Sequence, residues 1–417
     1  MFAHLIRREA RPRIQSVVAQ FKMTSDETSR CEPPYVSIAI FAWNEERAIE
    51  STLRSLLEQD LYTELRRREL SCEVICVANG CTDRTAEVAG HFLSQRRGHH
   101  PDRGALHCRV VNLAARGKVN AWNQFVHRLS APTSSFLFMM DADILIHRHE
   151  TLRSMLNTLE NDPGATVAVD VPRKDIAFKK RQSLSERLSL AASRMTSRAE
   201  GQLCGQLYCI RAEAARRIYM PKDLAACEDG FIKALVCTDF LEHAPWPGKL
   251  RVAPDAEHTF EAYISPLSIL KNQKRQIIGQ TIVHLLVDHY LPALRASELQ
   301  DLPAFLGAKD ATDPGWLKRL ITEHLRRSRA FWRLHPGLLG NRLQHLRRLR
   351  PVQKICCLPA ALASSGTALV ASFLAYRSLK KGCTDYWPKA RRVGLEQTRR
   401  VRPEHTEIPT SLAKPSP

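Results

Sequence analysis

Residues 138–143 read Phe-Met-Met-Asp-Ala-Asp and end an apolar run that begins near Ser135. The run predicts a buried strand that leads directly into two carboxylates, Asp141 and Asp143. Carboxylates beside a buried strand end are costly unless a cation or hydrogen bonds compensate. Mg²⁺ and Mn²⁺ prefer carboxylate and phosphate oxygens, so the pair indicates a divalent-metal site. The alternative is a solvated turn that carries two ordinary acids.

On both sides of this strand, apolar strands alternate with amphipathic helices. Further strands are expected at 36–41, 73–78 and 106–113, and helices after Asn44, after Asp83, at 117–129 and around 152–159. Such alternation predicts an α/β fold with a mostly parallel central sheet flanked by helices. Ligands bind such sheets at the carboxyl ends of the strands, where the polar motifs of this chain lie.

A second pair of acids, Glu228 and Asp229, opens a predicted helix after Cys227. A helix N-terminus stabilises a carboxylate, so helix capping is the simpler interpretation. The alternative is that one acid serves as a general base for a hydroxyl group.

Two further motifs follow predicted strands. The turn from Asn79 to Thr85 contains Gly80 and can seat a nucleotide at a helix start, or can be an ordinary strand-to-helix turn. Lys118 follows Gly117 and can meet a phosphate, although a lysine at a helix start is more often solvated. The upstream glycine spacing of a P-loop is missing.

Composition sets the broad class. The 417 residues carry a formal net charge of +19, and such a surface attracts nucleic acid, anionic lipid or phosphorylated small molecules. Twelve cysteines without paired CxxC motifs indicate free thiols in a reducing compartment and argue against a structural zinc site. The N-terminus lacks the pattern of a secretory signal.

Taken in order, these motifs resemble the family 2 glycosyltransferases of the GT-A fold. The resemblance covers 36–279 and rests on five segments, which are 36–46, 77–85, 117–123, 141–143 and 228–229. It implies an inverting transfer of a sugar from a nucleoside-diphosphate donor, with a UDP-sugar expected, to an acceptor hydroxyl. The acceptor is expected to be lipid-linked or a cell-surface glycan precursor.

The resemblance also implies a role for each matched residue. Asp143 would be the main ligand of Mn²⁺ or Mg²⁺ with Asp141 beside it, and Asp229 would be the catalytic base, positioned by Glu228. The donor site implied by the resemblance comprises Ala42, Asn44, Glu45, Asn79, Asp83, Lys118 and Asp141.

The chain departs from the family pattern at two places. Asn79 stands where the family usually has aspartate, so it can accept a hydrogen bond but lacks the charge. Downstream, Arg275 and Gly279 match a Gln-x-x-Arg-Trp region whose Gln and Trp are missing, which favours a single-transfer enzyme over a processive polymerase. Arg275 is expected near the acceptor or the diphosphate. A histidine is a further metal ligand in some GT-A enzymes, so this role is one alternative for His258. The favoured expectation is a surface position outside the metal site.

Five regions are expected: an arm at 1–34, the GT-A catalytic domain at 35–280, a helical basic region at 281–354, a membrane-associated segment at 355–376 and a disordered basic tail at 377–417. The segment 355–376 holds 22 residues without a charge between basic flanks. Those flanks favour an interfacial or re-entrant segment on an anionic membrane at least as much as a full span, with a buried core helix as the alternative. The catalytic domain would then lie on the cytoplasmic face of a membrane, the inner membrane in a bacterium.

Two other functional classes remain open at this point. A sugar-nucleotide pyrophosphorylase would require a Gly-rich basic loop after the first strand, where this chain has the acidic sequence Asn44-Glu45-Glu46. A non-catalytic basic scaffold for membrane or nucleic acid would leave the acids at the strand ends without a role, and no nucleic-acid partner is expected.

Overall fold

The computed structural model describes residues 33–97, 106–179, 181–183, 186–187, 190, 201–224, 226–263, 265–328, 334 and 351–382. Most of the expected arm (1–34) and basic tail (377–417) therefore lies outside the described residues.

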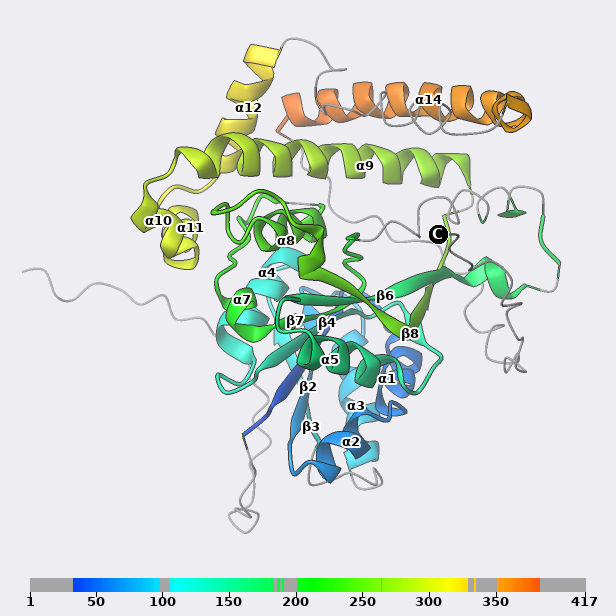
Figure 1. Ribbon diagram of the computed structural model, residues 1–417, viewed down its shortest axis with the longest axis vertical. Helices are drawn as coiled ribbons and strands as arrows, with labels where there is room; N and C mark the ends of the chain where they lie inside the picture. The colour runs from blue at the N-terminus through cyan, green and yellow to red at the C-terminus, as the bar shows by residue number, and fades with distance from the viewer. Residues whose placement is uncertain are drawn as a thin grey trace, which may run out of the picture.

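An eight-stranded sheet forms the centre of the molecule, in the order β3-β2-β1-β4-β7-β6-β8-β5 (Figure 1). Its strands are β1 Val36–Ala42, β2 Cys72–Asn79, β3 Leu106–Leu113, β4 Phe136–Asp141, β5 Leu145–Ile146, β6 Val167–Lys174, β7 Leu207–Arg211 and β8 Leu250–Phe260. The first four are mutually parallel, β7 runs antiparallel to β4 and β6, and β8 is parallel to β6. The predicted mostly parallel α/β sheet is confirmed.

Helices cover both faces of this sheet because side chains on a strand alternate between its faces. On β1, Ile38 and Ile40 join the core under α1 (Ile49–Leu57), α2 (Leu61–Arg67), α3 (Thr85–Arg97) and α5 (Thr151–Asn161). Ala39 and Phe41 join the opposite core under α4 (Lys118–Gln124) and α8 (Glu228–Cys237). The predicted helix at 117–129 is α4 followed by a π-helical turn at Phe125–Leu129.

The C-terminal region is helical, as expected. It contains α9 (Pro266–His284), α10 (Ala296–Gln300), α11 (Leu302–Thr312), α12 (Trp316–Ser328) and α14 (Pro351–Lys380). The expected domain boundary at 280 falls inside α9, which lies over the sheet domain with α14 beside it (Figure 1). Ala368, Ala371 and Ala375 of α14 are buried. The uncharged segment 355–376 therefore belongs to one continuous helix. Within the described residues, no helix combines the length and the apolarity that a bilayer crossing requires.

Glycine 279 allows α9 to approach the start of α8 directly. A Cβ atom at this position would lie 2.7 Å from the Ala226 carbonyl carbon and 2.6 Å from the Cys227 Sγ. Cys227 itself has a left-handed backbone, with φ of 60°, and immediately precedes Glu228. The helical region thus packs against the residues that place the second acid pair.

Candidate active site

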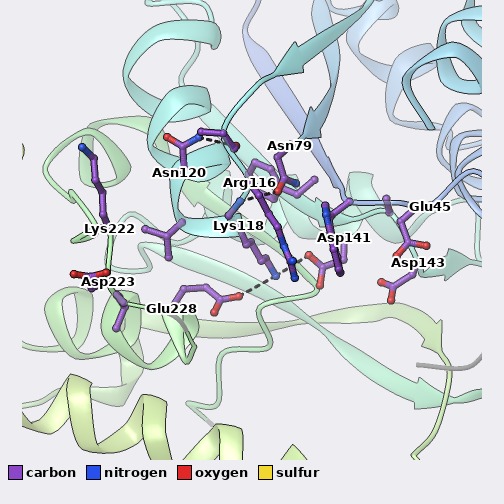
Figure 2. A pocket seen from close by; sticks show the side chains of 17 residues that line it. Glu45, Asn79, Arg116, Lys118, Asn120, Asp141, Asp143, Lys222, Asp223 and Glu228 are labelled. Atoms are coloured by element: carbon purple, nitrogen blue, oxygen red, sulfur yellow. Dashed lines mark hydrogen bonds and ion pairs between the residues drawn. The ribbon is translucent and has the colours of Figure 1, made fainter. Parts of the chain in front are cut away.

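A pocket of about 420 Å³ opens at the carboxyl ends of β1, β2 and β4 (Figure 2). Four loops and the start of α8 line it, because the ends of parallel strands meet at one edge of the sheet. Its lining residues are Phe41, Trp43, Glu45, Asn79, Ala115, Arg116, Gly117, Lys118, Val119, Asn120, Asp141, Ala142, Asp143, Lys222, Asp223, Leu224 and Glu228.

The Lys118 side chain joins the two acid motifs. Its Nζ lies 2.6 Å from Asp141 Oδ1 and 3.0 Å from Glu228 Oε1, and it donates a hydrogen bond of 2.9 Å to the Gly205 carbonyl. Only 18% of the Lys118 side chain is exposed. Burial disfavours its charge, but the Asp141 and Glu228 carboxylates outweigh burial and raise the pKa of Lys118. This ammonium group is therefore a fixed positive charge in the wall of the pocket.

The four acids around this lysine differ in their proton affinity. Burial raises the pKa of Asp141 to about 7, although Lys118 draws it down, and burial also raises the pKa of Asp143. For Glu228, Lys118 outweighs burial and lowers the pKa. Burial and the adjacent Glu228 carboxylate raise the pKa of Asp229 to about 6. Asp229 is consequently the acid of the second pair that can take a proton near neutral pH.

The first acid pair is chemically suited to a divalent cation. Asp141 and Asp143 both face the pocket, and carboxylate oxygens are the ligands that Mg²⁺ and Mn²⁺ prefer. Lys118 already holds one oxygen of Asp141. Nowhere in the described part of the chain do three potential ligand side chains surround one position. A metal would therefore be held by Asp143, with Asp141 beside it and the remaining ligands supplied by substrate or water.

The expectation of an exposed His258 is wrong, because β8 places its ring in the interior. The Nδ1 atom lies 2.6 Å from Asp170 Oδ2, and neither side chain is exposed. Burial opposes protonation, but the Asp170 carboxylate outweighs it and raises the pKa of His258 to about 10. This positive charge in turn favours the ionised form of Asp143. The sequence signal was the alternation of β8, which was not predicted as a strand.

Asn79 clamps two of the loops through its amide. It donates a hydrogen bond of 2.8 Å to the Ala42 carbonyl and accepts one of 3.1 Å from the Gly117 N–H. The Asn79 side chain is buried. Aspartate could not make the first of these bonds, because a carboxylate does not donate. Asn79 thus fixes the loop that carries Lys118 relative to the end of β1.

Other residues predicted for the nucleotide-sugar site hold the neighbouring turns and do not line the pocket. Asn44 exchanges hydrogen bonds with Thr82, and Asp83 accepts from the Thr85 backbone and hydroxyl and from the Glu46 N–H. Ala42, Asn44, Asp83, Asp229 and Arg275 do not line the pocket. Arg275 on α9 nevertheless favours the ionised forms of Glu228 and Asp229 through its charge.

Two features of the pocket were not predicted. The Arg116 guanidinium stacks 3.5 Å over the Trp43 ring, and both residues line the pocket. Their separate loops gave no sequence signal for this contact. Lys222, Asp223 and Leu224 form a further part of the wall, and only their position shortly before Glu228 could have indicated it.

Comparison with known proteins finds the family that the sequence motifs resemble. The model of the family described as "Glycosyl transferase family 2" matches residues 37–218. Residues 1–349 of TarS from S. aureus are similar in structure, with 17% identity, a TM-score of 0.40 and coverage of 83% of this chain and 91% of that chain. The same fragment in complex with UDP has 17% identity, a TM-score of 0.40 and coverage of 86% and 94%.

Glucosyl-3-phosphoglycerate synthase from Mycobacterium tuberculosis, in complex with Mn²⁺, UDP-glucose and phosphoglyceric acid, has 15% identity and a TM-score of 0.39, and the match covers 63% of this chain and 82% of that chain. No curated protein matches the present chain.

The contacts of Lys118 predict a large stability effect. Lys118→Met would leave the buried Asp141 and Glu228 carboxylates facing each other without compensation, so we expect a loss of about 3–5 kcal/mol in the free energy of unfolding. Urea denaturation measures it. Adding Asp141→Asn should restore part of the loss.

The matched control for this change is Arg327→Met, which breaks an exposed pair with Glu323 and should change stability little. A Lys118→Met protein as stable as the wild type would show that the buried charge cluster is not held by this lysine.

Proposed function

We propose that this chain, whose residues 37–218 match the model of glycosyl transferase family 2, is a member of that family. It transfers a sugar from a nucleoside diphosphate to an acceptor hydroxyl with inversion of configuration. It is a glycosyltransferase with the GT-A fold that uses a nucleotide sugar. The observation that carries the proposal is the pocket in which Lys118 joins Asp141 to Glu228, with Asp143 also in its lining. Asp229 follows Glu228 in the chain at the start of α8. A UDP-sugar is the donor to test first.

The donor would lie along the part of the pocket that the loops after β1, β3 and β4 supply. Glu45 and the Arg116–Trp43 stack offer polar and planar surfaces for the nucleoside. The Lys118 ammonium offers a positive charge for the diphosphate, in a site shielded from water where electrostatic interactions are strengthened. Asn79 supports this arrangement from behind by fixing the Lys118 loop.

Asp229 would act as the general base. Its carboxylate takes the proton of the acceptor hydroxyl while the hydroxyl oxygen forms a bond to the anomeric carbon. The bond between that carbon and the diphosphate oxygen breaks, and the nucleoside diphosphate leaves with the electron pair. A single displacement inverts the anomeric centre. Burial, together with the ionised Glu228 that Lys118 holds, raises the pKa of Asp229 to about 6 and so suits it to proton uptake.

We propose Mn²⁺ or Mg²⁺ as the cofactor, held by Asp143 with Asp141 beside it. When bound, such an ion neutralises negative charge on the diphosphate leaving group.

The two alternative classes are less well supported. After β1 the chain carries Asn44 and Glu45, and Asn44 is bonded to the neighbouring turn. This is not the glycine-rich basic loop that a pyrophosphorylase would require. A non-catalytic scaffold would give no role to a buried Lys118–Glu228 pair beside two further acids. Nucleotide-sugar hydrolysis with and without Mn²⁺ separates these classes.

We further propose that α14 rests on an anionic membrane, which would bring a lipid-linked acceptor near the pocket. On this helix Leu369, Val370 and Phe373 are 39%, 50% and 44% exposed, on the side opposite the alanines that are buried beside α9. Arg377, Lys380 and Lys381 follow them. An apolar face bordered by basic residues is typical of interfacial helices. The catalytic domain would then lie on the cytoplasmic face, where nucleotide sugars are available.

Asp229→Asn should lower kcat by about 10²–10⁴-fold, because it removes the general base, and should leave UDP binding intact. Since the base must be ionised and its pKa is about 6, wild-type kcat/KM should fall as the pH drops through about 6 and level off above it. Steady-state kinetics over a pH series measure both effects.

Asp239→Asn is the matched control for the base, because Asp239 follows the other end of α8 and pairs with Lys249. The Asp239 variant should keep the wild-type kcat and the same fall of kcat/KM at low pH. A variant at Asp229 that keeps its turnover but loses UDP affinity would reassign this residue to donor binding.

Asp143→Ala should abolish transfer and weaken Mn²⁺ binding in the presence of UDP, because the main ligand is gone. Titration calorimetry measures the binding, and circular dichroism checks that the variant is folded. Asp255→Asn removes an exposed acid of β8 as the control. Full activity of the Asp143 variant, or of the wild type in excess EDTA, would contradict the metal assignment.

Replacing Leu369, Val370 and Phe373 by serine should weaken binding to phosphatidylserine-containing vesicles by about tenfold or more, because each large apolar side chain contributes ~1–3 kcal/mol when buried. Co-sedimentation measures the binding, and pure phosphatidylcholine vesicles test the charge dependence. Val252→Ser, an exposed apolar residue of β8, is the control. Equal sedimentation of all three proteins would exclude membrane docking through this face and favour a soluble acceptor.

A further inference from the structure

Lys222 and Asp223 lie on the side of the pocket opposite Glu45 and Asp143 (Figure 2), and the next residue, Leu224, also lines the pocket. They belong to the segment 218–224, which has no regular secondary structure and ends shortly before Glu228. A wall without strand or helix bonds of its own must be held by its neighbours.

One neighbour is the helix α4. The Asn123 amide donates a hydrogen bond of 2.8 Å to the Met220 carbonyl and accepts one of 3.1 Å from the Met220 N–H. His127, in the following π-helical turn, contacts the Ile218 carbonyl at 2.8 Å. These contacts fix the first half of the segment from the side of the sheet domain.

The other neighbour is the C-terminal helical region, through the buried carboxylate of Asp310 on α11. Its Oδ2 accepts from the Lys222 backbone N–H at 2.8 Å, and its Oδ1 accepts from the Trp316 Nε1 at 2.8 Å. Asp310 is 6% exposed, and burial raises its pKa while these two donors lower it. A buried carboxylate is costly unless it is bonded in this way, so its placement here needs a reason.

Two further contacts join the same elements. The Tyr219 ring packs across Gly307 of α11, and burial together with Asp310 raises the pKa of Tyr219 to about 12. Lys318 of α12 lies 3.2 Å from Asp223, which lines the pocket. The wall is thus connected to α11 and α12 at three successive points.

From this geometry we infer that Asp310 is a positioning residue, which holds the 218–224 segment so that the C-terminal helices complete the acceptor side of the pocket. This inference rests on the proposed function for the meaning of that side, since the donor is assigned to the loops after β1, β3 and β4. The hydrogen bonds of the Asp310 carboxylate go instead to Lys222 and Trp316. Its loss should therefore affect the acceptor and spare the donor.

The first test is hydrogen exchange of the full-length protein without ligand. Asp310→Ala should speed exchange across 218–224, because the Lys222 amide loses its acceptor. Asp310→Asn keeps the volume but offers one acceptor oxygen to two donors, so it should speed exchange less than Asp310→Ala. Trp316→Phe keeps the Lys222 bond and should leave exchange unchanged. The matched control is Asp313→Asn, an exposed acid at the end of α11 that pairs with Arg319.

The second test separates acceptor from donor. With UDP-glucose as donor and octyl β-D-glucopyranoside as the hydroxyl probe, Asp310→Ala should raise the acceptor KM by about tenfold, because small misplacements of a binding wall are costly. The dissociation constant for UDP should not change, and thermal unfolding of each variant shows whether it is folded.

If hydrogen exchange across 218–224 were unchanged in both Asp310 variants, the inference that Asp310 holds this segment would be overturned, whatever the activity. Faster exchange with an unchanged acceptor KM, or with an equal loss of UDP affinity, would overturn its role on the acceptor side. A wild-type protein that neither binds UDP nor hydrolyses nucleotide sugars would instead overturn the proposed function, while the exchange result would still decide whether Asp310 holds the wall.

Discussion

The bond between the Lys118 ammonium and two carboxylates is the constraint on which the site depends. Asp141 ends β4, Glu228 starts α8, and Lys118 begins α4, so this contact joins three elements that approach the strand ends from different directions. Buried acids repel each other, and without a positive charge between them they could not share one pocket. The lysine also keeps Glu228 ionised, and that charge helps to set the proton affinity of Asp229.

Two contacts outside this cluster help to hold its members in place. Asn79 fixes the loop in front of Lys118, and Gly279 lets α9 lie against the residues before Glu228. The site is therefore built jointly by the sheet and by the C-terminal helices. A catalytic unit that ended at residue 280 would cut through α9 and lose the contacts that α11 and α12 make with the 218–224 segment.

Much of this arrangement could be predicted from the sequence. The apolar strands could be predicted because the pattern that marks a strand lies within a few consecutive residues. The strand expected at 106–113, for example, agrees with β3. The meeting of Asp141, Asn79 and Glu45 followed from the rule that parallel strands end at one edge. The contacts of Lys118 with Glu228 and of Lys222 with Asp310 join residues far apart in the chain, and no local pattern encodes them. The buried His258 was missed because the strand that carries it was not recognised.

The clamp at Asn79 has a consequence for the chemical durability of the protein. An asparagine followed by glycine is the dipeptide most prone to deamidation, in which the glycine nitrogen attacks the side-chain carbonyl carbon. Here the Gly80 N–H is bonded to the Leu113 carbonyl at 2.8 Å, and both ends of the Asn79 amide are engaged. The folded turn thus withholds the nucleophile and immobilises its target, whereas the unfolded chain protects neither. Ageing at this position would yield an aspartate that cannot donate to Ala42, so the working lifetime of the site is linked to the time that each molecule spends folded.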